Sequence, residues 1–207
     1  MSDGTWSDDT SDGTGPASSS VGPLPDGFDL VGSETVFRSS FTTIRRDRIR
    51  MPDGDVTERE IAEHLSAVGA VPLDADDRVV LVRQYRHAFG RHYLEIPAGK
   101  LDVDGEDPAA AMRRELAEEV ELAAADLETL VTFTNSAGWT TEQTTVYLAT
   151  GLSAEPRPDD FDLTHEEADM EVVRIPLDEA VAMVHAGEIV DSKTVIGLLA
   201  VADRRRR

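Results

Sequence analysis

The sequence predicts an α/β sandwich built on a mixed sheet, preceded by a small N-terminal antiparallel β region. Apolar runs of strand length are separated by turn signals over residues 34–100. One strongly amphipathic helix interrupts the strands, and two more amphipathic helices follow near the end of the chain. Because strands and helices do not alternate regularly, a doubly wound parallel sheet is not expected.

The N-terminal part is predicted to be a tail followed by a β region. Residues 1–32 form an acidic, Ser- and Gly-rich segment that is expected to be disordered. Residues 33–66 carry β-branched and aromatic residues around the turn signal Pro52-Asp53-Gly54, which predicts two or three strands. Residues 67–207 are expected to form the main domain.

The main domain begins with two apolar runs in "GAVPLDADDRVVLVRQYR", which predict a hairpin, and "YLEIPAG" predicts another short strand. A helix is predicted from Asp107 to Val120, with Asp107 as N-cap and Pro108 at the first helical position. Strands are then expected in "LETLVTFTNS", "QTTVYLAT" and "MEVVRI", and helices in "LDEAVAMVHAG" and "SKTVIGLLAVADRR".

Composition limits the classes of function. The chain of 207 residues has a formal net charge of -21, which opposes binding to nucleic acid or anionic membranes. It contains no cysteine, which excludes disulfides and thiolate metal sites. No apolar run is long enough to cross a bilayer and no signal peptide is recognisable, so a cytoplasmic protein is expected. The acidic, Lys-poor balance is typical of proteins from cells that accumulate salt.

The helix over residues 107–120 raises an electrostatic problem. Ala109, Met112, Leu116 and Val120 form its apolar stripe. Three glutamates, Glu115, Glu118 and Glu119, converge beside that stripe near the C-terminal end, where the helix dipole disfavours them. The bland interpretation is a solvated acidic surface. The alternative is a hard divalent cation held by oxygen ligands, which implies a phosphate ester or anhydride as substrate.

The order of residues decides between these interpretations. Glu106 is followed, after seven residues, by the run Arg114-Glu115-Leu116-Ala117-Glu118-Glu119. This order resembles the Nudix box of the Nudix hydrolases, G-x5-E-x7-R-E-U-x-E-E-x-G-U, in which U is aliphatic. Leu116 and Leu122 fill the two aliphatic positions. The resemblance implies a Nudix-type α/β/α sandwich with a mixed sheet.

The match has two departures. Gly99 lies six residues before Glu106 instead of five, and Glu121 replaces the second glycine, which makes a left-handed helix end harder to form. Outside the box, "VRQYR" and "YLEIPAGKLD" resemble segments of the ADP-ribose pyrophosphatase subfamily. That subfamily commonly has Pro where this chain has Ala137.

Motif positions imply the roles of individual residues. The implied ligands of Mg²⁺ or Mn²⁺ are the main-chain carbonyl of Ala98 and the carboxylates of Glu115, Glu118 and Glu119. The residues implied to act on water are Glu118, Glu119 and Glu142. The implied substrate-binding residues are Arg59 and Arg86, and the supporting residues are Gly99, Glu106 and Arg114. Two points stay open: Arg86 could equally form an ordinary ion pair, and Glu95 is functional only if it is buried beside the metal.

The implied reaction is hydrolysis of the pyrophosphate bond of ADP-ribose to AMP and ribose 5-phosphate, with divalent ions neutralising the phosphate oxygens and activating water. Alternatives are another nucleoside diphosphate derivative (a nucleotide sugar, NADH or a dinucleoside polyphosphate) and a nucleotide sensor without turnover. The subfamily resemblance further implies a homodimer formed through the N-terminal β region, which would bring Arg59 to a neighbouring site.

Overall fold

A computed structural model describes residues 22–39, 42–103, 105–158 and 169–207. The predicted disordered tail therefore lies outside the described residues over positions 1–21. The chain divides into two compact units, Met1–Ile61 and Ala62–Arg207, which are described separately.

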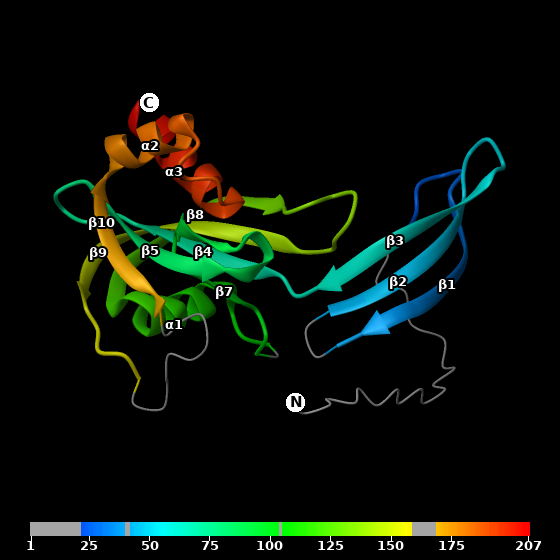
Figure 1. Cartoon of the computed structure of the whole chain (residues 1–207), viewed down its shortest axis with the longest axis horizontal. Helices are drawn as coiled ribbons and strands as arrows, with labels where there is room; N and C mark the ends of the chain where they lie inside the picture. Colours follow the sequence, from blue (N-terminus) through cyan, green and yellow to red (C-terminus); the bar gives the residue numbers. More distant parts are fainter. Residues whose placement is uncertain (1–21, 40–41, 104, 159–168) are drawn as a thin grey trace, which may run out of the picture. The chain divides into compact units, whose positions relative to one another are not determined.

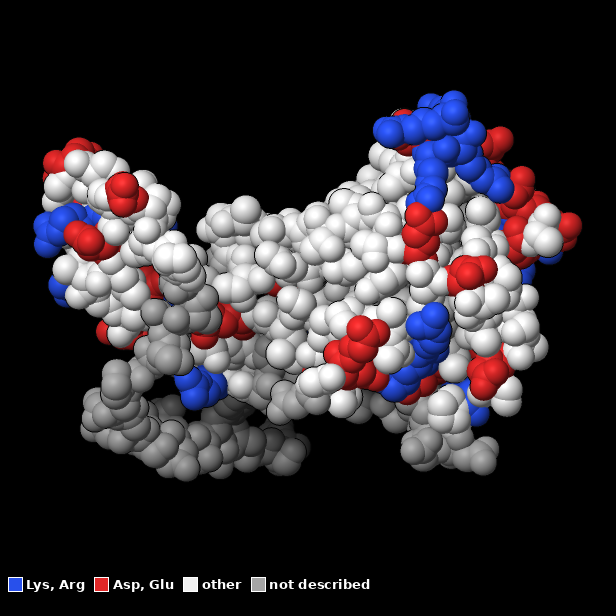
Figure 2. Space-filling model, turned by 180° about the vertical axis from the view of Figure 1, so that it is seen from behind, with Lys and Arg blue, Asp and Glu red and all other residues white. Residues whose placement is uncertain are grey.

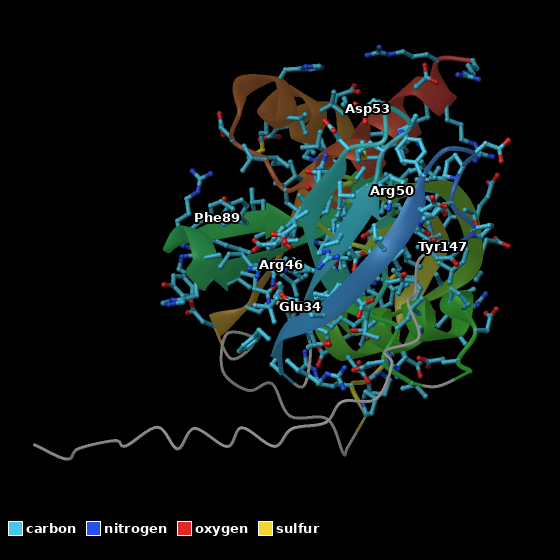
Figure 3. The ribbon with its side chains drawn as sticks, turned by 90° about the vertical axis from the view of Figure 1, so that its right-hand side faces the viewer. Glu34, Arg46, Arg50, Asp53, Phe89 and Tyr147 are labelled. Carbon is cyan, nitrogen blue, oxygen red and sulfur yellow. The ribbon has the colours of Figure 1, made fainter. Side chains whose placement is uncertain are left out.

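The N-terminal unit contains a three-stranded sheet of order β1-β2-β3, in which β1 (Asp29–Arg38) and β2 (Thr42–Arg50) are antiparallel and β3 is Val56–His64. The predicted turn connects β2 to β3, where Gly54 has a φ of 93° and donates its N–H to the Met51 carbonyl at 2.9 Å. Across the strands, the Arg46 guanidinium contacts Glu34 at 3.2 Å, and Figure 3 labels both residues. It also contacts Glu60 at 2.9 Å. These cross-strand pairs stabilise the register of the sheet.

The second unit contains two sheets of order β10-β5-β6 and β7-β4-β9-β8. Their strands are β4 (Ala67–Pro72), β5 (Arg78–Arg86), β6 (Arg91–Glu95), β7 (Ala98–Lys100), β8 (Leu122–Thr134), β9 (Gln143–Ala154) and β10 (Glu171–Pro176). β4 and β9 are parallel, whereas β4 and β7 are antiparallel. The predicted mixed sheet is therefore confirmed.

The prediction that the first two strands of the main domain form a hairpin is wrong. β4 and β5 belong to different sheets, and only one isolated bridge, between Leu73 and Val79, connects their ends. Both strands carry consecutive buried residues, so each has both faces covered and lies between two other partners. The apolar runs were read correctly as strands, but their pairing depends on distant segments.

Side-chain alternation along the strands separates two layers of the core. Val68 and Ala70 of β4 pack with the helix α1 (Pro108–Val120), whereas Val71 packs with α2 (Leu177–Ala186) and α3 (Ser192–Arg205). Figure 1 shows α1 on one side of the strands and α2 and α3 on the other. This arrangement is the predicted α/β/α sandwich. None of the helices in the described segments is long and apolar enough to cross a bilayer.

The three predicted helices form where expected. The Asp107 carboxylate caps α1 by accepting the N–H groups of Ala109 and Ala110, and Pro108 is the first helical residue. α3 has Asp191 as its N-cap. At its other end Arg204, Arg205 and Arg207 pair with Glu128, Asp77 and Asp203, and Figure 2 shows basic side chains gathered there. Cations at a helix C-terminus also interact favourably with its dipole.

The C-terminal end of α1 is held by a residue from a distant segment. Glu121 adopts a left-handed conformation, with φ 55° and ψ 43°, although it has a Cβ. Its N–H caps the helix through the carbonyls of Leu116 and Ala117. Arg157 donates to the Glu118 carbonyl at 2.6 Å and lies 3.5 Å from the Glu121 carboxylate. Arg157 thus supplies a cation to a helix end that lacks the usual glycine.

Glu121→Gly is expected to stabilise the protein. Removing the Cβ relieves a left-handed conformation that costs a non-glycine residue about 1 kcal/mol, which corresponds to a rise in Tm of roughly 2–4 °C. The lost pair with Arg157 is partly exposed and contributes little. Thermal unfolding followed by circular dichroism measures the change.

Glu121→Ala is the matched control, because it removes the carboxylate but keeps the Cβ. Its Tm should not rise. An equal rise in both variants would assign the effect to the carboxylate and contradict the strain argument.

Candidate functional site

The segment between β6 and β7 is anchored from both helical layers. The Ile96 N–H donates to the Thr194 hydroxyl of α3 at 2.9 Å, and the Ala98 N–H donates to the Glu119 carboxylate of α1 at 2.9 Å. Thr194 and Ile96 are completely buried. The main chain that carries Ala98 is therefore fixed relative to the carboxylates of α1.

The three glutamates of α1 do not form a solvated surface. Glu118 and Glu119 are 8% and 9% exposed, and the Glu115 side chain is 12% exposed. Burying a charged carboxylate costs free energy unless it is paired or binds a metal. The bland interpretation of the acidic cluster is therefore wrong for these residues.

Arg114 lies at the centre of this cluster. Its guanidinium contacts Glu106 at 3.2 Å, Glu115 at 2.8 Å and Glu118 at 3.0 Å, the last being four residues further along the helix. Hydrogen bonding to Glu106 and the neighbouring carboxylates raise the pKa of Arg114, so it is charged at all relevant pH values. Among these four side chains, one guanidinium faces three carboxylates.

The electrostatic cost appears at Glu115. Burial raises the pKa of its carboxyl to about 7, Arg114 opposes the rise, and repulsion by Glu118 adds to it. A carboxyl with such a pKa lacks sufficient positive charge around it.

Gly99 provides the space that the Glu115 carboxylate occupies. A Cβ at position 99 would lie 2.0 Å from the Glu115 carboxyl carbon and 2.1 Å from one of its oxygens. The absence of a side chain therefore lets this carboxylate lie against the backbone of the loop, one residue from the Ala98 carbonyl. This is a specific reason for glycine at this position.

The donor set fits a hard divalent cation. It offers the carboxylates of Glu115, Glu118 and Glu119 together with the nearby Ala98 carbonyl, all oxygen ligands of the kind that Mg²⁺ and Mn²⁺ prefer. Within the described part of the chain, no three Asp, Glu or His side chains are already arranged to hold an ion between them. Arg114 engages Glu115 and Glu118, and the Ala98 N–H engages Glu119. The number, the charge and the oxygen chemistry of these donors fit a divalent cation. Because the donors already bond to Arg114 and to the Ala98 N–H, some of the side chains must reorient when an ion binds.

A second polar cluster adjoins the first. The Glu95 side chain is 2% exposed and accepts two hydrogen bonds from Arg86, at 2.7 and 2.6 Å. Lys193 donates to the same carboxylate at 2.5 Å and to Asp191 at 3.1 Å. Glu95 is therefore buried, and its partner Arg86 is half-buried, with 43% of its side chain exposed. The functional roles of both residues stay predictions.

Sequence reasoning did not single out Lys193 as a site residue. Its signal was available, because Lys193 is one of only two lysines in the chain and follows the N-cap Asp191 in a helix start that disfavours cations.

The structure does not bring every predicted residue to the cluster. The Glu142 carboxylate lies 3.8 Å from the His64 ring, and none of its described contacts is with the glutamates of α1. Arg59 belongs to the N-terminal unit, where its guanidinium bonds Thr57 and the Glu58 carbonyl. The roles of Glu142 and Arg59 stay predictions.

Comparison with known proteins agrees with this geometry. The NUDIX domain family matches residues 63–195, and the family described as nucleoside diphosphate sugar hydrolase N-terminal domain matches residues 29–61. The ADP-ribose pyrophosphatase of Mycobacterium tuberculosis is 44% identical over 84% of this chain and 83% of its own length. The methanol dehydrogenase activator of Bacillus methanolicus is 33% identical over 81% and 89%.

A solved structure described as an ADP compounds hydrolase superposes with a TM-score of 0.76 at 24% identity, covering 89% of this chain and 97% of the other. At this identity the likeness establishes the fold. The family follows from two other findings, the domain match over most of the second unit and the 44% identity to an ADP-ribose pyrophosphatase, and the buried carboxylates of the box agree with it. The protein belongs to the Nudix hydrolase family.

Proposed function

We propose that this Nudix hydrolase cleaves the pyrophosphate bond of ADP-ribose, giving AMP and ribose 5-phosphate, in a reaction that depends on Mg²⁺ or Mn²⁺. The observation that carries the proposal is the group of buried glutamates at the end of α1, of which Glu115 and Glu118 share Arg114 with Glu106. Carboxylates gathered at this depth offer the oxygen ligands that a divalent cation bound to a diphosphate would use.

ADP-ribose is favoured by the relative named ADP-ribose pyrophosphatase, with 44% identity over most of both chains. The description of the N-terminal family keeps nucleoside diphosphate sugars as the main competing class. A sensor without turnover is disfavoured, because the carboxylates of the box are all present.

The carboxylates of Glu115, Glu118 and Glu119 and the Ala98 carbonyl would hold the cation, which supplies charge neutralisation at the phosphates and acidifies bound water. Gly99 admits the Glu115 carboxylate, and Arg114 with Glu106 orients the cluster. A carboxylate among Glu118, Glu119 and Glu142 accepts the proton of the attacking water. The rest of the proposal is the same whichever of these three carboxylates accepts the proton.

Arg86 is suited to hold a substrate phosphate. Its Nε and Nη2 atoms bind Glu95, so Nη1 lies outside both bonds, and the side chain is 43% exposed. A guanidinium fixed along one edge can offer another edge to a phosphate. In a chain of net charge -21, local cations of this kind are needed to bind an anionic substrate.

One assay tests the function: release of AMP from ADP-ribose, ADP-glucose, NADH and diadenosine tetraphosphate, with Mg²⁺, with Mn²⁺ and with EDTA. We expect the highest kcat/KM for ADP-ribose. In EDTA we expect no hydrolysis of any of the four compounds. A higher kcat/KM for ADP-glucose would replace the substrate but keep the chemistry. Absence of turnover on every compound would contradict the proposed function.

Gly99→Ala is expected to reduce kcat/KM by roughly ten- to a hundredfold, because the new Cβ displaces the Glu115 carboxylate. The displaced atoms are the far end of a flexible side chain, so Tm should change little. Gly32→Ala is the control, since a Cβ there meets nothing within 4 Å. Unchanged kcat/KM in Gly99→Ala would show that the position of Glu115 beside Gly99 is not used.

We further propose that the protein is a homodimer assembled through the N-terminal β region, over residues 33–66. A three-stranded sheet needs a buried hydrophobic face for its stability, yet Val36 and Phe37 of β1 are 49% and 57% exposed. Light scattering in high salt should give twice the chain mass of 22.5 kDa, and Phe37→Glu should shift it toward one chain. The mass of one chain for the unaltered protein would contradict the dimer.

The cytoplasmic location stays a prediction from sequence.

A further inference from the structure

Lys193 lies in an electrostatically unfavourable place on its own helix. It is the second residue of α3, after the N-cap Asp191 and Ser192, and cations are disfavoured at a helix N-terminus. Its side chain is 14% exposed, and its ammonium is held by Glu95 at 2.5 Å and Asp191 at 3.1 Å. The contacts that keep Lys193 here thus come from anions, one of them on the strand β6.

Glu95 connects Lys193 to Arg86. Burial opposes ionisation of Glu95, but Arg86 and Lys193 together hold the pKa of its carboxyl below the usual value. Its Oε1 accepts from Arg86 alone, whereas Oε2 accepts from both Arg86 and Lys193. The ammonium therefore fixes the orientation of the carboxylate that in turn fixes the guanidinium.

Arg86 is held on the segment that leads to the glutamates of α1. Its partner Glu95 lies three residues before Ala98, whose N–H donates to the Glu119 carboxylate at 2.9 Å. The pKa of Arg86 is raised, chiefly by its hydrogen bonds to Glu95, and further by the charges of Asp191 and Glu119. A phosphate bound at the glutamates of α1 would come within reach of the free edge of Arg86.

Charges within this second cluster are balanced. Arg86 and Lys193 carry two positive charges, and Glu95 and Asp191 carry two negative charges. Without Lys193, Arg86 is the remaining cation of this cluster. The carboxylates of Glu95 and Asp191 then attract its guanidinium more strongly. Removing Lys193 also removes one of the two hydrogen bonds that Oε2 of Glu95 accepts, so that the carboxylate, and through it Arg86, is held in place by fewer contacts.

We propose that Lys193 is a positioning residue for substrate binding: acting through Glu95, it holds Arg86 with one edge presented to a phosphate of the nucleoside diphosphate substrate. The inference rests on the proposed function, since it needs Arg86 to bind that phosphate. It assigns a binding role to α3, which lies outside the Nudix box and in the opposite layer of the sandwich from α1.

A double-mutant cycle tests this role on the full-length protein, with the substrate of highest kcat/KM in the assay above. Lys193→Met should raise KM roughly tenfold, as expected for loss of a charge-assisted hydrogen bond, with kcat within about threefold. Arg86→Ala should raise KM by at least as much. In the Arg86→Ala background, Lys193→Met should change KM by less than about twofold, because the residue through which it acts is gone.

Two further variants separate positioning from folding. Lys193→Arg keeps a cation that can reach Glu95 and should restore KM to within about threefold of wild type. Arg78→Met removes a cation shared by Asp74 and Asp76 at the other end of β5, and it should leave KM unchanged. Tm of every variant is measured, and kinetics are recorded well below the lowest Tm.

The outcomes are distinct. Equal fold-changes from Lys193→Met in the wild-type and Arg86→Ala backgrounds would overturn the inference, because they would show a general effect of charge. A loss of Tm without a change in KM would overturn it in favour of a structural role. Failure of the wild type to hydrolyse any compound would overturn the proposed function, and this inference with it.

Discussion

Repulsion among the buried carboxylates of α1 is the constraint on which the rest of this structure depends. Two like charges about 4 Å apart repel by roughly 4 kcal/mol at an effective dielectric constant of 20. Arg114, the Ala98 N–H and the shift of Glu115 toward a neutral carboxyl each relieve part of that repulsion. Even the end of the helix receives a cation, since Arg157 reaches the Glu118 carbonyl from the segment after β9. We propose that the cluster is kept at this cost because it holds a metal and, through it, a diphosphate.

The sandwich positions the site by holding one short piece of main chain from both sides. Between Glu95 and Ala98, the chain is hydrogen-bonded to α3 through Thr194 and to α1 through Glu119. The helical layers, whose apolar side chains pack in separate core clusters, are thus both hydrogen-bonded to this connection.

The acidic composition gives the local cations their importance. With a net charge of -21, the protein repels a diphosphate at long range. Arg86, held by the buried Glu95, offers a guanidinium edge where the substrate is proposed to bind, and Lys193 helps to neutralise Glu95. At the surface, by contrast, pairs such as those of Arg204 and Arg207 are exposed and contribute little to stability.

The sequence by itself determined the elements whose signals are local: the capped helix starting at Pro108, the turn at Gly54, the two late helices and the spacing of the box carboxylates. These follow from periodicity and capping within a few residues. Tertiary structure alone decided that β4 and β5 enter different sheets, that Glu115 lies against Gly99, and that Lys193 reaches Glu95 from 98 positions away. Strand partners and buried ion pairs depend on which distant segments share the core, and no local pattern encodes that choice.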